Sequence, residues 1–148
     1  MGSSVFQVQA KENSISGGSS LSTGIAVKPG QVLIISADPN ETWKVGTDIG
    51  TGRGVSNANG LGNPLGGDHG FLNRNGQSFL YGCLVGSLDG GRTYFGVGTH
   101  LTMTILTKGT LTLHYWDENN IDNSGAIRVH VNVYEGPANV NPFVPSQK

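Results

Sequence analysis

The chain has 148 residues, which is enough for one domain with a hydrophobic core and too few for two domains of ordinary size. Charged residues make up 13% of the chain and the formal net charge is -1, so the surface lacks the strong field that would attract nucleic acid or an anionic membrane. The 24 glycines follow no three-residue period, which excludes collagen and favours many tight turns between short strands.

The N-terminal sequence lacks the features of a secretory signal peptide. Met1-Gly2-Ser3-Ser4 has no basic residue and no apolar run follows it, and no segment of the chain is apolar over the length that spans a bilayer. The expected localisation is cytoplasmic, with release by a route that needs no signal peptide left open. The single cysteine, Cys83, allows no internal disulfide and is expected to be a small buried hydrophobic residue.

The first half of the chain predicts short strands separated by turns. Residues 1–22 contain a weakly alternating strand and a Ser/Gly-rich connector, which forms either a flexible arm or a long turn. Residues 23–27 and 31–36 are apolar and β-branched, and Lys28-Pro29-Gly30 between them predicts a type II turn, within either a hairpin or a strand corner. Residues 46–77 have room for no more than one short strand, and loops of this length tend to be functional.

The second half predicts a longer series of strands. Residues 79–88 are expected to form a buried strand, which turns at Asp89-Gly90-Gly91 and is followed by strands over 92–97 and 101–106. The clearest alternation lies in two segments that each have one apolar and one solvent-facing side, namely 110–116 and 127–134. About eight short strands without an amphipathic helix predict an all-β, antiparallel jelly-roll sandwich. Its body spans residues 23–136 of a single domain, and residues 137–148 form an extended tail.

The loop between the last two strands carries the strongest chemical signal. Three carboxylates and three amides fall within seven residues, 117–123, without a Lys or Arg among them. Calcium resolves this crowding of like charge because it takes about six to eight oxygen ligands, whereas zinc would require His or Cys. The spacing is not that of an EF-hand, because the sixth position from Asp117 is Asp122 and the twelfth is Arg128. The loop is therefore either a calcium site or a solvated turn in which Asp and Asn bond to their own backbone.

The order of these features resembles the calcium-dependent galactophilic lectins of the bacterial PA-I type. A strand is followed by Asp117, a short loop, Asp122-Asn123-Ser124-Gly125 and a valine-rich strand, and the resemblance covers roughly residues 20–135. It implies a galactose-binding-like fold, bound Ca²⁺, galactose-type glycans as partners and a homo-oligomer. The calcium ligands that it implies are side chains and main-chain carbonyls, namely Asp117, Asp122 and Asn123, the carbonyl of Asn119 or Asn120, and the carbonyl of Trp43.

The resemblance also implies how the sugar is held. Two neighbouring hydroxyls of the sugar would bind the ion directly, with Asp117, Asn119 and Asn123 hydrogen-bonded around them. A histidine and an amide from the long middle loop would touch a further hydroxyl, and these fall on His69 and Asn73. The loop after Asp117 is shorter than in the best-known galactose binders, which makes the calcium prediction stronger than the galactose prediction.

Other functions remain as alternatives. The chain could be a structural or assembly sandwich in which calcium only stiffens the 117–123 loop, or in which the loop binds nothing. Enzyme motifs are absent, which leaves only a carboxylate pair such as Asp68 and Asp117, so we expect no enzyme. Trp116 either stacks on a sugar ring or packs within the sandwich, while His114 and the other strand histidines are expected on a solvent face or hydrogen-bonded to a partner.

Overall fold

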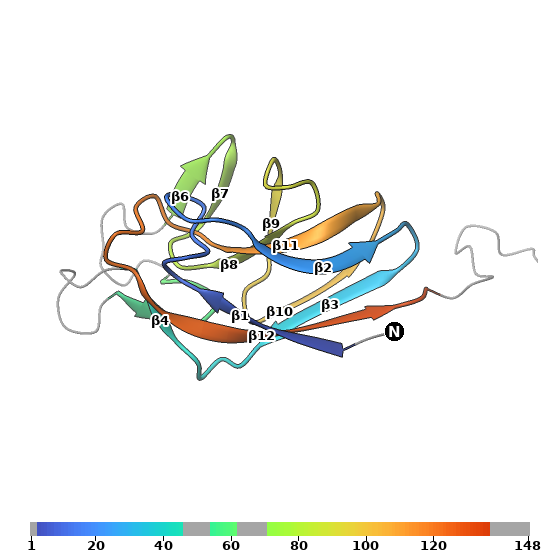
Figure 1. Cartoon of the computed structure of the whole chain (residues 1–148), viewed down its shortest axis with the longest axis horizontal. Helices are drawn as coiled ribbons and strands as arrows, with labels where there is room; N and C mark the ends of the chain where they lie inside the picture. The colour runs from blue at the N-terminus through green and yellow to red at the C-terminus, as the bar shows by residue number, and fades with distance from the viewer. Residues whose placement is uncertain (1–2, 46–53, 62–70, 137–148) are drawn as a thin grey trace, which may run out of the picture.

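The chain folds into two antiparallel sheets that pack face to face, with a small hairpin beside them (Figure 1). This confirms the predicted all-β sandwich. The computed structural model describes residues 3–45, 54–61 and 71–136, and within this part no helix is long and apolar enough to cross a membrane. The tail predicted over 137–148 lies outside the described residues. The strands are β1 (Ser3–Gln9), β2 (Leu21–Val27), β3 (Val32–Ala37), β4 (Trp43–Lys44), β5 (Val55–Ser56), β6 (Phe71–Arg74), β7 (Gln77–Leu80), β8 (Leu84–Ser87), β9 (Tyr94–Gly96), β10 (His100–Thr104), β11 (Gly109–Tyr115) and β12 (Ser124–Tyr134).

The first sheet is organised around β12, which has 11 residues. Strand β1 pairs with it antiparallel, from Ser3 opposite Asn132 to Gln9 opposite Ala126. Strand β3 pairs with the second half of β12, β4 pairs with its first two residues, and β10 and β5 complete the sheet. Strand β12 thus starts at the 117–123 loop, the candidate loop, and runs the whole length of the sandwich (Figure 1).

The second sheet has the order β2-β11-β8-β9. Strand β2 belongs to this sheet while β3 belongs to the first, so the turn between them is a corner that crosses from one sheet to the other. The predicted type II turn is confirmed, because the N–H of Gln31 donates to the carbonyl of Lys28 at 3.2 Å and Gly30 has a φ of 94°. The connector before β2 is an ordered turn, in which Asn13 accepts from the N–H of Gln9 and donates to Ser19.

The hydrophobic core lies between the two sheets and follows from the period of two along the strands. Burial of one large apolar side chain in this core stabilises the fold by about 1.5–3 kcal/mol. Three strands contribute two or more fully buried core residues each: Leu33 and Ile35 in β3, Leu111, Leu113 and Tyr115 in β11, and Ile127, Val129 and Val131 in β12.

The other face of β11 is exposed at Thr110 but buried at His114 and Trp116, contrary to the prediction of a wholly solvent-facing side. Trp116 is 0% exposed and packs edge-on against the rings of Phe79 and Tyr94, with ring centroids 4.9 and 5.2 Å away, while its Nε1 donates to the carbonyl of Leu72 at 2.9 Å. His114 is also buried, and this burial lowers its pKa from 6.5 to about 4. The β6–β7 hairpin and the Tyr94 side chain from β9 cover this end of the face, so stacking of Trp116 on a sugar is excluded and packing is its role.

Two strand predictions in the middle of the chain were also wrong. Within the described part of residues 46–77 there are two short strands, β5 and β6, and β7 begins at Gln77. The strand predicted over 79–88 is interrupted, because Tyr81 and Gly82 leave the ladder to bond elsewhere: the N–H of Gly82 donates to Trp116, and the carbonyl of Tyr81 accepts from Leu61. These bonds join the hairpin and the loop end of β11 to the body of the sandwich.

Candidate functional site

The candidate loop connects β11 to β12 at one end of the sandwich, on the left in Figure 1. Asp117 is only 5% exposed. Its carboxylate oxygen Oδ1 accepts a hydrogen bond from the N–H of Glu118 at 2.8 Å, whereas its Oδ2 has no hydrogen-bond partner. Asn123 is also 5% exposed; its Nδ2 donates to the carbonyl of Ala10 at 2.9 Å, which leaves its Oδ1 buried without a partner.

Buried oxygens without partners gather at this loop. Among the described residues, three buried side-chain oxygens lack a hydrogen-bond partner: Asp117 Oδ2, Asn123 Oδ1 and the hydroxyl of Tyr115. A buried polar group that is left unpaired costs about 1–3 kcal/mol, and more when it is charged. Asp117 Oδ2 and Asn123 Oδ1 can only accept, so a bound cation would satisfy both of them.

The electrostatics of Asp117 agree with this interpretation. Burial raises the pKa of its carboxyl from 3.8 to about 6, while the amide of Asn123 and the N–H groups of Glu118 and Asn119 lower it by a smaller amount. The carboxylate is therefore held in an environment that disfavours its charge. A cation placed against it would reverse this effect and bring the pKa down again.

Strand β4 brings Trp43 to the same place. Trp43 pairs with Gly125, two residues beyond Asn123, so its main chain borders the loop. The indole itself is committed to the core: its Nε1 donates to Gly82 at 2.8 Å, and the ring packs edge-on against Tyr115 with centroids 4.5 Å apart. Only the main-chain groups of Trp43 remain for a site, which is the role predicted for it.

The outer residues of the loop are more exposed. Asn119 accepts the N–H of Ile121 through its side chain, whereas the side chain of Asn120 donates to the carbonyl of Lys11. Asp122 is half-buried. A cleft of about 270 Å³ opens on this side of the loop, and it is lined by Ser16, Gly17, Glu118, Asn119, Asn120 and Ile121.

Of the predicted sugar contacts from the long middle loop, Asn73 lies among the described residues. His69 lies outside the described residues, as does Asp68, the carboxylate considered as a partner for Asp117. Asn73 is exposed on β6, where its side chain donates to Ser78 at 2.9 Å. Since side chains alternate along a strand, Asn73 points away from the face of β6 on which Arg74 reaches Ser16 at the cleft.

No signal in the sequence predicts the part that the N-terminal segment plays at the loop. Ala10 accepts from Asn123, the hydroxyl of Ser14 lies 3.5 Å from the carbonyl of Asp117, and Ser16 and Gly17 form one wall of the cleft. These residues are about one hundred positions from the loop in sequence, and nothing in their spacing indicates a site. The Tyr115 hydroxyl was also missed, because strand alternation predicts only that the ring is buried.

The donor set fits a hard cation better than a soft one. The described residues contain no group of three or more His, Cys, Asp or Glu side chains that could hold a metal. What the loop offers instead is carboxylate, amide and carbonyl oxygen, the ligands that calcium prefers. A calcium site that used only two of the three loop carboxylates, Asp117 and Asp122, would bind weakly, with a Kd on the order of 10⁻⁵ to 10⁻³ M.

The chain is similar to a solved lectin domain. The solved structure of the EclA N-terminal domain, described as a PllA-like lectin, is 25% identical in sequence, with a TM-score of 0.59 over 87% of this chain and 94% of that chain. This fold is lectin-like. A functionally unknown conserved protein mutant from Bacillus anthracis str. Ames is 14% identical with a TM-score of 0.41, over 92% of this chain and 23% of that chain, which supports no further statement. No family model matches the chain, and no curated protein matches it.

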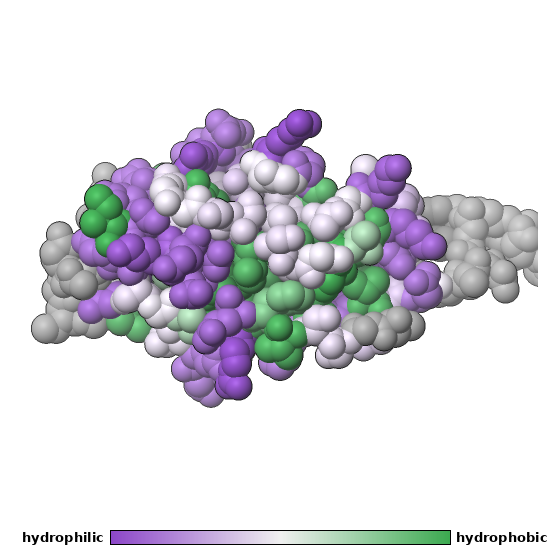
Figure 2. Space-filling view, in the orientation of Figure 1, coloured by the Kyte–Doolittle hydropathy of each residue, from purple (hydrophilic) through white to green (hydrophobic). Residues whose placement is uncertain are grey.

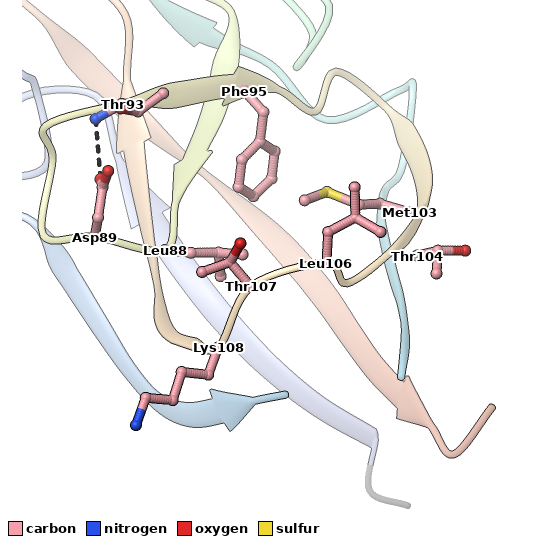
Figure 3. A pocket seen from close by; sticks show the side chains of 9 residues that line it. All are labelled: Leu88, Asp89, Thr93, Phe95, Met103, Thr104, Leu106, Thr107 and Lys108. Atoms are coloured by element: carbon pink, nitrogen blue, oxygen red, sulfur yellow. Dashed lines mark hydrogen bonds between the residues drawn. The ribbon is translucent and has the colours of Figure 1, made fainter. Parts of the chain in front are cut away.

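A second hollow in this lectin-like sandwich lies between β9 and β10, and it shares no lining residue with the cleft at the loop (Figure 3). It has a volume of about 360 Å³ and mainly apolar walls, formed by Leu88, Phe95, Met103 and Leu106. Asp89 at its rim is already satisfied, because it accepts hydrogen bonds from the N–H groups of Arg92 and Thr93. Unlike the loop, this hollow contains no buried polar atom in need of a ligand.

Gly125 is expected to be required for the approach of β4 to the loop. Its φ is 90°, and a Cβ at this position would lie 3.0 Å from the Cα of Trp43. A left-handed backbone alone costs a non-glycine residue about 1–2 kcal/mol. Because of the added clash, Gly125→Ala should lower the free energy of unfolding by more than this amount. Gly24→Ala is the matched control, since Gly24 also has a positive φ, of 71°, but faces open space. Equal losses in urea denaturation of the two variants would contradict a close approach at Gly125.

Proposed function

We propose that this protein is a calcium-dependent lectin that binds a galactose-type sugar at the 117–123 loop. The observation that carries the proposal is the pair of buried, unpartnered acceptors, Asp117 Oδ2 and Asn123 Oδ1, at one end of a lectin-like sandwich. The EclA N-terminal domain is described as a lectin, and at 25% identity this likeness supports carbohydrate binding here.

In this proposal the ion is held by oxygen atoms from one strand, β4, and one loop. Asp117 and Asn123 contribute their unpartnered oxygens, Asp122 adds a second carboxylate, and Trp43 adds a main-chain carbonyl. The last ligand is a carbonyl of Asn119 or Asn120. We favour Asn119, because the carbonyl of Asn120 already accepts the N–H of Asn123 at 3.2 Å.

The sugar would bind on the exposed side of the loop. Calcium exchanges water for hydroxyl oxygen with little geometric cost, and a neutral diol needs no counter-charge. Asp117, Asn119 and Asn123 would then hydrogen-bond to the hydroxyls that reach the ion, and the cleft beside the loop gives room for the ring. His69 remains a proposed contact, whereas the outward position of Asn73 argues against its taking part without a rearrangement of β6.

One observation favours the alternative of a purely structural ion. Asp117 and Asn123 are each only 5% exposed, so a cation between them would be largely shielded from solvent. In that case calcium would stiffen the loop, and the outer amides would bind no sugar.

Calorimetry separates these functions. We expect calcium to raise the melting temperature. At a calcium concentration of one hundred times Kd, binding should add about 2.7 kcal/mol to the free energy of unfolding. Calcium-loaded protein should then release heat with methyl galactosides at millimolar concentration, and EDTA should abolish that heat. Stabilisation by calcium without binding on a glycan array would support the structural role. Sugar binding that survives EDTA would disprove the calcium-mediated mechanism.

A further inference from the structure

Strand β1 forms an edge of the first sheet. Among the described strands it pairs only with β12, along all seven residues from Ser3 to Gln9. Backbone N–H and C=O groups point alternately to the two sides of a strand, so about half of those in β1 face outward without a strand partner. An edge of this kind is a template for another strand.

The sequence of β1 lacks the features that usually protect an edge. Ser3–Gln9 contains no charged residue, no proline and no glycine. The other edges of the described sheets are shorter or irregular: β2 contains Gly24 at a positive φ beside a register shift, β5 and β9 have only two and three residues, and β10, which also lacks proline and glycine, has five residues against seven in β1. Strand β1 is therefore the edge best suited to pairing with another chain.

Apolar side chains are exposed along the same side of the molecule. Val5 on the outer face of β1 is 53% exposed, and Phe6 on its inner face is only partly buried. Leu21 and Ile25 in β2, the edge strand of the second sheet, are partly buried as well. Figure 2 shows apolar atoms in the band between β1 and β2. Both sheets thus leave part of the core open at this side of the sandwich.

We propose that β1 is a dimer interface, in which the β1 strand of a second copy pairs with it antiparallel across a two-fold axis. A two-fold axis places a surface against itself, so any charge in β1 would face or neighbour its own copy. Because Ser3 to Gln9 carries no charge, two copies of the strand can pair without repulsion between like charges. Pairing would satisfy the outward backbone groups, join the two first sheets into one, and cover Val5 and Phe6.

The geometry of such a dimer determines how its loops are placed. Strand β1 runs toward the candidate site, since Ala10 directly after it bonds to Asn123. In an antiparallel pair the two loops would therefore lie at opposite ends of the dimer. If the proposed lectin function also holds, one dimer could link two separate surfaces, whereas the interface itself does not depend on calcium or sugar.

Sedimentation equilibrium of the full chain without calcium or sugar tests the interface. We expect a mass of twice 15.5 kDa at micromolar concentration, and a dissociation constant at least tenfold higher for Val5→Lys. Leu106→Lys is the matched control, because Leu106 is 83% exposed but lies between β10 and β11, and it should associate as the wild type does. A wild-type monomer at 100 µM, or equal association of Val5→Lys and wild type, would overturn the proposal.

Hydrogen exchange gives a second readout that does not require a variant. Amide exchange in residues 3–9 should slow as the protein concentration rises, while exchange in β10, another edge strand, should not change. Concentration-independent exchange in β1 under conditions where the protein is dimeric would place the interface elsewhere. If Val5→Lys fails to fold, as judged by circular dichroism, Gln7→Lys replaces a second exposed residue of β1 and carries the same expectation.

Discussion

Asp117→Asn should make the calcium-free protein more stable at neutral pH and abolish its stabilisation by calcium. Because burial raises the pKa of Asp117 from 3.8 to about 6, the folded wild type loses stability as the pH rises through this range. The rise in pKa corresponds to about 3 kcal/mol of destabilisation above pH 6. The neutral amide of asparagine carries no such cost, so the variant should exceed the wild type most at pH 7.5 and least below pH 4.

Urea denaturation in EDTA at several pH values measures this difference. The buried His114, whose pKa is lowered to about 4, acts in the opposite sense, since its contribution is lost as the pH falls from 6.5 to 4. His114 is present in both proteins, so its contribution cancels when the wild-type curve of stability against pH is subtracted from that of the variant. Asp38→Asn, which changes an exposed carboxylate away from the loop, serves as the control. A difference that does not vary with pH, together with a melting temperature that calcium still raises, would rule Asp117 out as the ligand.

Trp116→Ala should cause the largest loss of stability of any single change considered for this protein. It removes a fully buried indole, the contacts with Phe79 and Tyr94, and the hydrogen bond to Leu72, and changes of this kind cost about 3–5 kcal/mol. Trp116→Phe keeps an aromatic ring in the cluster but leaves the carbonyl of Leu72 without its donor. It should therefore cost less than the alanine variant.

The effect of Trp116→Ala should also be local. Since the Trp116 side chain connects β11 to the β6–β7 hairpin, amide exchange over residues 71–80 should accelerate more than exchange in β3, which lies in the other sheet. Urea denaturation gives the total loss, and exchange gives its distribution. An alanine variant in which the hairpin keeps its protection would show that other contacts hold it in place.

The sequence was sufficient for features that depend on neighbouring residues. The turn at Lys28-Pro29-Gly30 requires only the fixed φ of proline and the positive φ of glycine, and it was predicted correctly. The alternation in β11 and β12 likewise identified two of the longest strands. Whether the turn made a hairpin or a corner depended on which sheet received β3, which no local signal specifies.

The errors arose where distant segments meet. Trp116 was expected on a solvent-facing side because its own strand alternates, and only the folding of the β6–β7 hairpin over β11 buries it. The candidate site likewise combines residues that are close in the sequence with residues that only the fold brings to them. The Asp and Asn residues of the loop are visible in the sequence as a cluster, whereas the contacts of Ala10 and Ser14 with that loop depend on the pairing of β1 with β12.

The direction of β1 and β12 has a practical consequence for measuring weak ligands. Strand β12 leaves the candidate loop at Ser124 and ends at Tyr134, and β1 starts opposite Asn132, near that far end. Attachment of either end of the described chain to a sensor chip would therefore leave the loop facing the flowing solution. Immobilisation through Lys11, whose carbonyl accepts from Asn120, would instead bring the chip against the loop and reduce the signal.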